Sequence, residues 1–179
     1  MKWIFFACSL LTSATLFSQK IVWRENRKLT WNDFKSPANT KNNSDIVAYT
    51  HCGLQYSVVK SSDPKSYVKI DIETIFNEDK SWKDVKRIND YILGHEQKHF
   101  DITEIYARKL RKEVAEKIKT SGDFDRSFKS IYNRILNDYK AFQMAYDKDT
   151  KHGMDKERQA QYNITVAEEL ENLKSYQKS

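Results

Sequence analysis

Hydrophobic residues recur at helical spacing through the middle of the chain, from residue 88 to residue 114. They stand three or four positions apart, which is the spacing of the buried stripe of an amphipathic helix. Ser81, with an acid three residues later, resembles an imperfect capping box, and Gly122 lies where the pattern stops. The pattern therefore predicts a long helix that begins near Ser81 and ends before the segment 120–123.

Two later segments show the same periodicity. The first runs from about residue 125 to residue 146, where YDKDTKHG breaks it, and the second from about residue 154 to residue 174. Because the chain has only 4 glycines and 2 prolines, few positions interrupt helices. We expect two more long helices here.

Residues 19–80 show the shorter periodicity of strands. The segments 21–25, 46–59 and 66–76 are strand candidates, and SSDPKS (61–66) suits a hairpin connection. In the last strand Val68, Ile70 and Ile72 alternate with polar residues, and Phe76 rejoins the apolar side after a slip. Strands precede helices, so the predicted fold class is α+β, with N-terminal antiparallel strands followed by three long helices.

The first 18 residues differ from the rest. Lys2 precedes the apolar run WIFFACSLLTSATLF, which is the layout of a secretory signal peptide. The alternative is an N-terminal membrane anchor, although the run is short for a span. Cys8 is too early for a lipoprotein signal. We therefore expect an exported protein, periplasmic or secreted, with one domain at 19–179 and no membrane span in the mature chain.

Composition and charge narrow the function classes. Hydrophobic residues make up 39% and charged residues 31%, which indicates a globular chain. The net charge of +6 comes from interleaved signs, whereas a nucleic-acid surface needs a one-signed patch, so we expect no nucleic-acid partner. Loss of the signal would leave Cys52 as the only cysteine, which excludes an internal disulfide and favours a small buried residue.

The stretch LGHEQKHFD (93–101) carries the candidate chemistry. On a helix His99 lies about 40° around the axis from His95 and one turn along, so both imidazoles can reach one ion. Glu96 can approach a water at that ion, which is the arrangement of the HExxH motif of zinc hydrolases. Gly94 suggests close packing by another segment. The alternative is a pair of histidines buried in a helix core, with partners for their nitrogens.

A catalytic zinc site needs a third protein ligand. Asp101 and Glu104 lie on the wrong side of an ideal helix. His152 stands where the chain turns between two predicted helices, and His51 stands at a strand start. The geometry favours His152, because converging loops often carry function, and it leaves His51 open.

The run LGHEQKHFDITEIYARKLRK, followed about fifty residues later by YDKDTKHG, resembles a family of secreted bacterial proteins. That family is described as zinc-dependent proteases by prediction and is otherwise classed as a domain of unknown function. LTWNDFKSP and the SW at 81 and 82 also match it. The resemblance implies a zincin-like domain at 19–179, with the HExxH helix in its core and Zn²⁺ as cofactor. It also implies His95, His99 and His152 as metal ligands and Glu96 as catalytic base.

These observations predict an exported zinc-dependent peptidase acting on a peptide or protein substrate. Tyr146 is the first candidate for a donor to the oxyanion and Tyr162 the second, and Asp147, Asp149 or Asp101 would orient a ligand imidazole. The strand 66–76 is a candidate edge for binding an extended peptide, with an ordinary half-buried strand as the favoured alternative.

Three alternatives remain open. One is a zinc-binding envelope module without catalysis, another is an amide hydrolase acting on cell-wall peptides, and the last is a basic, metal-free module that binds a partner. The sequence leaves the oligomeric state open.

Overall fold

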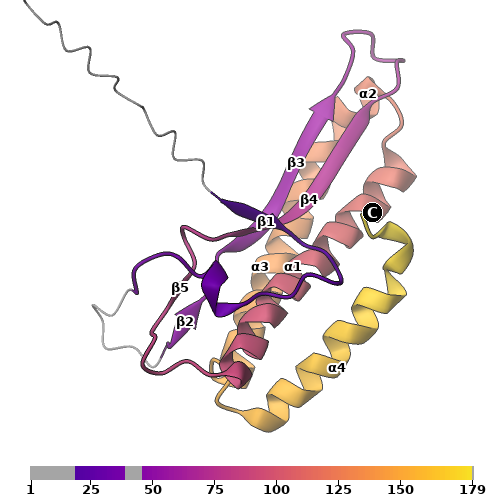
Figure 1. Ribbon diagram of the computed structural model, residues 1–179. Coiled ribbons are helices and arrows are strands. Elements are labelled where there is room, and N and C mark those ends of the chain that lie inside the picture. The colour runs from indigo at the N-terminus through magenta and orange to yellow at the C-terminus, as the bar shows by residue number, and fades with distance from the viewer. Residues whose placement is uncertain (1–18, 39–45, 179) are drawn as a thin grey trace, which may run out of the picture.

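A long antiparallel hairpin is the main strand feature of the fold (Figure 1). Its arms are β3 (Cys52–Val59) and β4 (Lys69–Asn77), and β1 (Lys20–Val22) pairs with the end of β4, giving the order β1-β4-β3. A second small sheet joins β2 (Ala48–Tyr49) to β5 (Trp82–Lys83). The computed structural model describes residues 19–38 and 46–178, so the expected signal peptide at 1–18 lies outside the described residues.

Helices follow the strands along the chain, as predicted. They are η1 (Trp31–Asp33), α1 (Asp90–Lys117), α2 (Ser121–Asp123), the π-helical η2 (Phe124–Phe128), α3 (Lys129–Thr150), α4 (Lys156–Asn172) and η3 (Lys174–Tyr176). The three long helices are α1, α3 and α4, and the predicted α+β class is confirmed.

Helix α1 lies between the strands and the other long helices, packing against β3 and β4 and against α3 and α4. Its apolar face and those of α3 and β4 share one buried cluster that includes Ile72, Ile102 and Ile135. In β4 the inward positions continue through Thr74 to Phe76 without the predicted slip, because the buried Thr74 hydroxyl donates a hydrogen bond to Glu104.

Helix α1 ends before the segment 120–123, as predicted, but it begins later than predicted and Gly122 is not its C-cap. Ser81 does not cap the helix: its neighbours form β5, and the N-cap is Asn89, whose side chain accepts from the amide of Ile92. Helix α1 ends at Lys117, and Gly122 lies inside the next helix, where its amide donates to the carbonyl of Pro64 in the hairpin connection. Tertiary pairing of Trp82 with Tyr49 therefore replaced the local helix signal.

A buried ion network fixes the rotation of α1. Glu104 binds Arg108 and Arg111, and Arg108 also donates to the carbonyl of Leu170 and the side chain of Gln177. Glu104 follows His95 by nine positions, and Arg108 follows His99 by nine positions. Residues nine apart lie on opposite sides of a helix. The network therefore holds one face of α1 against the C-terminal segment and turns the histidine face to the other side.

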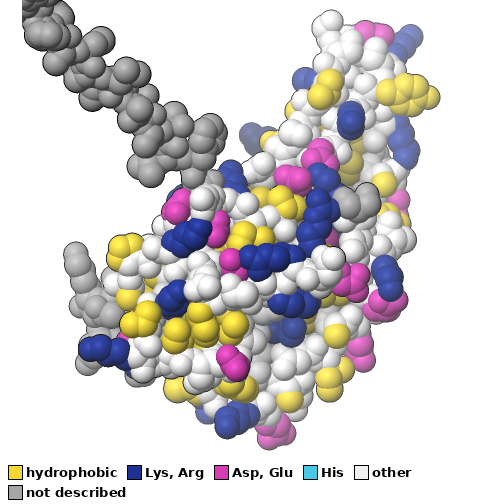
Figure 2. Space-filling view, viewed as in Figure 1, with side chains coloured by type: hydrophobic (Ala, Val, Ile, Leu, Met, Phe, Trp, Pro, Cys, Tyr) yellow, Lys and Arg dark blue, Asp and Glu magenta, His cyan; other side chains and the backbone are white. Residues whose placement is uncertain are grey.

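No helix in the described part of the chain is long and apolar enough to cross a membrane. On the face shown in Figure 2, lysine and arginine side chains lie among acidic and hydrophobic ones.

Candidate metal centre

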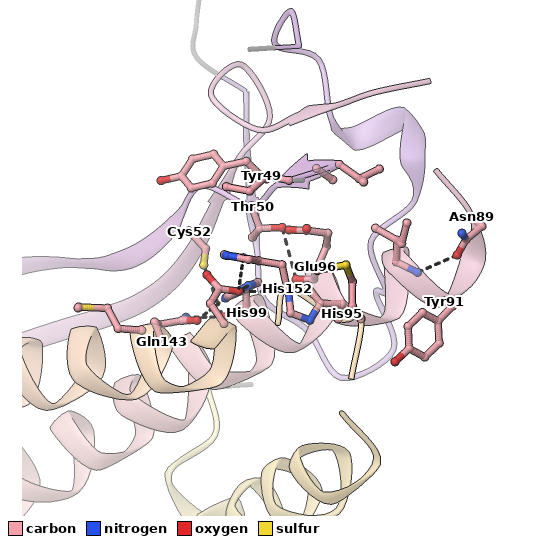
Figure 3. A pocket seen from close by; sticks show the side chains of 18 of the residues that line it. Tyr49, Thr50, Cys52, Asn89, Tyr91, His95, Glu96, His99, Gln143 and His152 are labelled. Carbon is pink, nitrogen blue, oxygen red and sulfur yellow. Dashed lines mark hydrogen bonds and ion pairs between the residues drawn. The ribbon is translucent and has the colours of Figure 1, made fainter. Parts of the chain in front are cut away.

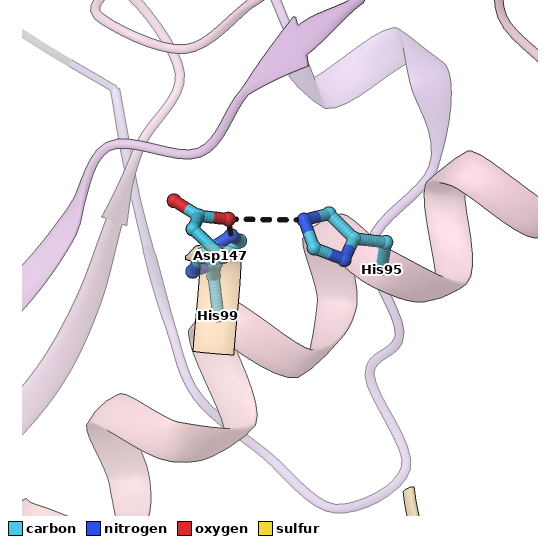
Figure 4. A group of neighbouring side chains, drawn as sticks. All are labelled: His95, His99 and Asp147. Atoms are coloured by element: carbon cyan, nitrogen blue, oxygen red, sulfur yellow. Dashed lines mark hydrogen bonds and ion pairs between the residues drawn. The ribbon is translucent and has the colours of Figure 1, made fainter. Parts of the chain in front are cut away.

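Two elements bring three potential ligands together. His95 and His99 stand one turn apart on α1, and Asp147 stands in the last turn of α3 (Figure 4). Their ligand atoms all lie within 4.8 Å of one another. The Nε2 atoms of His95 and His99 lie 3.2 Å and 2.9 Å from the same Asp147 oxygen, Oδ1.

The outer nitrogen of each imidazole faces a glutamine carbonyl. His95 Nδ1 lies 2.8 Å from Oε1 of Gln159, and His99 Nδ1 contacts Oε1 of Gln143. Each amide orientation is set elsewhere, since Gln143 Nε2 donates to the carbonyl of His99 and Gln159 Nε2 donates to the hydroxyl of Tyr146. Each Nδ1 therefore carries a proton. In a neutral imidazole this leaves Nε2 as an acceptor that can bind a metal ion, and in a protonated imidazole Nε2 also carries a proton and donates to Asp147.

The centre thus concentrates acceptor atoms. Burial would raise the pKa of Asp147, but hydrogen bonds from His95 and His99 outweigh burial and hold it well below its ordinary value. Burial would lower the pKa of His99, but the hydrogen bond to Asp147 and the nearby Glu96 charge raise it. Two imidazole nitrogens facing one carboxylate require a positive charge between them, supplied by protons or by a metal ion.

Glu96 is the buried acid beside this centre. Its side chain is only 4% exposed, and its Oε2 atom has no hydrogen-bond partner among the described residues. A buried, unpaired carboxylate oxygen is costly and needs a functional or bound partner to account for it. Glu96 lines the same cavity as His95 and His99, so its oxygen is available to a molecule held there.

The cavity lies between β2 and the start of α1 (Figure 3). Its volume is about 530 Å³, within the range of pockets that hold small ligands. Tyr49 and Thr50 lie on the β2 side and the HExxH residues on the α1 side. The centre is therefore open to molecules from solvent at one wall of a ligand-sized cavity.

His152 lies at this cavity but outside the trio. Its Nδ1 is 3.4 Å from Asp147 Oδ1, and its side chain is about half-exposed. It does not join the group of mutually close ligand atoms. His51 is not among the described residues that line the cavity, and its backbone amide donates to Ser81. The predicted role of His152 as third ligand stays a prediction, with Asp147 as the better placed alternative.

A strained turn carries His152. Lys151, His152 and Gly153 all have positive φ angles, of 52°, 55° and 83°. Positive φ is uncommon for residues other than glycine and costs free energy unless the surroundings enforce it. Thr150 helps to enforce it, because its hydroxyl accepts from the Gly153 amide and its carbonyl accepts from the Asp155 amide. The turn seats Gly153 against the His95 ring.

We expect Gly153→Ala to disturb the centre. A Cβ there would lie 3.2 Å from Cγ of His95, and φ of +83° is itself unfavourable for alanine. The expected result is a loss of about 1–3 kcal/mol of stability and about 10-fold weaker zinc binding, because the His95 ring must move. Thermal unfolding and zinc titration measure both. Gly94→Ala is the control, since a Cβ there meets no described atom within 4 Å; equal effects of the two changes would contradict the argument.

A family model described as bacterial protein of unknown function (DUF922) matches residues 29–153. The match includes the HExxH helix, Asp147 and the strained turn. The chain belongs to this family. Comparison with curated proteins and with solved structures gave no match. The DUF922 match shows a bacterial family but assigns it no activity. Any argument for protease chemistry therefore has to come from the geometry of the site.

Tyr146 lies behind the centre instead of in the cavity. It is fully buried, its ring stacks on His95 with centroids 4.7 Å apart, and its hydroxyl donates to the carbonyl of His95. This place suits a residue that positions His95 and does not suit the predicted donor to an oxyanion. Tyr162 packs against Tyr146 and donates to Asp149, so it too faces away from the cavity.

Other predicted site features also lie elsewhere. Asp101 accepts from the indole of Trp23 and from Lys98 and contacts neither imidazole. The strand candidate 66–76 became β4, which pairs with β1 and β3 and does not line the cavity, so its predicted role as the peptide-binding edge is wrong. A Cβ added at Gly94 would meet no described atom within 4 Å, so the expected close packing of another segment is not found among the described residues. Cys52 lies in the cavity wall, where burial raises the pKa of its thiol to about 11, in keeping with an inert residue.

Sequence reasoning missed the two glutamines and underrated Asp147. Gln143 and Asp147 stand four apart and therefore share one helix face, a pattern that was visible in the sequence. Gln159 gave no such signal, because its contact with His95 spans 64 residues.

Proposed function

We propose that the protein is a zinc-dependent peptidase with His95, His99 and Asp147 as metal ligands and Glu96 as general base. The observation that carries the proposal is the unpartnered, buried Oε2 of Glu96 beside three converging ligand atoms. A structural metal site has no use for an additional buried acid. The predicted export of the protein belongs to this proposal and rests on residues 1–18.

The donor set fits zinc. Two imidazoles and one carboxylate, with room for a further ligand, make up a common catalytic zinc site. Each imidazole donates its outer N–H to an amide oxygen, an arrangement typical of metal-ligating histidines. When bound, zinc supplies an acidified water and a positive charge for the substrate carbonyl.

The chain's own residues carry the proton transfers. Glu96 accepts a proton from the attacking water while the oxygen of that water bonds to the peptide carbonyl carbon. The carbon–nitrogen bond then breaks, and Glu96 returns the proton to the leaving amine. Gln143 and Gln159 keep His99 and His95 oriented throughout. Burial of Glu96 limits competing water around its carboxylate.

Strand β2 gives the cavity a wall suited to an extended peptide. The Asp84 amide donates to the Val47 carbonyl, and the register pairs Ala48 with Lys83. Backbone groups alternate in direction along an antiparallel strand, so those of Ala48 point away from β5. Ala48 lines the cavity, and β-augmentation by substrate would use these backbone groups.

The first test is zinc content together with proteolysis. We expect one zinc per purified chain, measured by atomic emission. We also expect digestion of denatured casein that stops on chelation and returns with added zinc. Zinc without any digestion would favour the non-catalytic zinc module, and absence of zinc binding would contradict the proposal altogether.

A further inference from the structure

Four of the residues that line the cavity have large hydrophobic side chains that are exposed to solvent. We call these four residues the apolar rim: Tyr49 on β2, Tyr91 on α1, Met144 on α3 and Met154 after α3. All four line the cavity, and their exposed fractions lie between 40% and 73%. Exposed apolar side chains gathered around one cavity indicate a binding surface.

The deeper walls are apolar as well. Val47 and Ile92 continue the lining from opposite sides, on the β2 segment and on α1. Ala48 follows Val47 in this wall, with its backbone groups directed away from β5. A peptide extended along β2 would therefore place alternate side chains against hydrophobic surface on its way past the centre.

Charged groups are few around the cavity. Among the described lining residues, the carboxylates are Glu96 and Asp147, both committed to the centre. Apart from the histidines, the basic lining residue in that part of the chain is Lys156, whose ammonium lies 5.6 Å from the centre of the Tyr91 ring. Basic substrate side chains would thus lose hydration without gaining a carboxylate that is not already committed to the centre, and among the described lining residues an acidic side chain would meet only the ammonium of Lys156.

We infer that the protein selects peptides with large hydrophobic side chains next to the cleaved bond. This inference rests on the proposed peptidase function and names its substrate class. Methionine side chains are flexible and polarisable, so Met144 and Met154 can adapt to aliphatic and aromatic groups alike.

The test uses binding to the zinc-loaded Glu96→Gln protein, so that turnover is not required. Three fluorescein-labelled peptides share one flank and carry Leu-Phe, Asn-Gln or Asp-Glu at their centre. By fluorescence anisotropy we expect the Leu-Phe peptide to bind at least about 10-fold more tightly than the others. Met144→Gln and Met154→Gln should each weaken binding of the Leu-Phe peptide by about 3- to 10-fold, because each substitution removes apolar contact at nearly constant side-chain size.

Two exposed apolar residues outside the cavity serve as matched controls. Ile164 is 61% exposed, the same fraction as Met154, and Val59 is 71% exposed, nearly the fraction of Met144. Neither Ile164 nor Val59 lines the cavity. Ile164→Gln and Val59→Gln should leave peptide binding unchanged. Equal affinity for the three peptides, no binding of any of them, or equal losses in rim and control variants would each overturn the inference. The peptidase proposal is judged separately, by casein digestion with the unmodified protein.

Discussion

Replacing Glu96 by glutamine should reduce peptide cleavage by about 10³-fold, because the amide cannot accept the proton of the attacking water. Zinc content should stay at one per chain, since Glu96 lies outside the group of ligand atoms. Thermal stability should stay equal or rise, because the substitution neutralises a buried carboxylate whose Oε2 has no described partner. Casein digestion, zinc analysis and thermal unfolding measure the three effects on one preparation.

Glu116→Gln is the matched control for this prediction. It makes the same change on the same helix, at an exposed position near the end of α1. We expect unchanged digestion and zinc content. Full activity of Glu96→Gln would remove Glu96 from the mechanism, whereas loss of zinc together with activity would make it a ligand or a structural residue.

The parts of the fold that were predicted correctly depend on local patterns. The stripe on α1 recurs every three or four residues over several turns, so sequence alone shows both the helix and its inward histidines. The same holds for α4, predicted at about 154–174 and observed at Lys156–Asn172. Long periodic segments carry enough repeats to outweigh individual exceptions.

The errors lie where a distant partner decides the outcome. Thr74 looked like a break in alternation, yet it is buried because Glu104 accepts a hydrogen bond from its hydroxyl. Trp82 looked helical, yet it pairs with Tyr49 across the small sheet. Neither partner can be identified from the neighbouring residues, since sequence separation hides it.

The end of α3 mattered most for the site. The polar run after Tyr146 suggested a loop, but the helix continues to Thr150, whose buried hydroxyl donates to the Tyr146 carbonyl. That additional turn places Asp147 on the helix face that meets α1. With the helix ended too early, Asp147 could be considered only as a partner of an imidazole, and His152 was preferred as ligand.

Asp147→Asn should therefore weaken zinc binding by about 10³-fold, beyond the roughly 10- to 100-fold typical of residues that only support a ligand. The amide keeps the shape of the side chain but loses the negative charge that both Nε2 atoms face. Asp149→Asn, the same change two residues along the helix and bonded to Tyr162, should bind zinc normally. His51→Ala should also bind zinc normally, and His152→Ala should retain one zinc with at most a 100-fold loss of affinity, estimated as for a supporting residue. Zinc titration of these variants decides between the two ligand sets: loss of zinc in His152→Ala with retention in Asp147→Asn would make the three-histidine prediction correct.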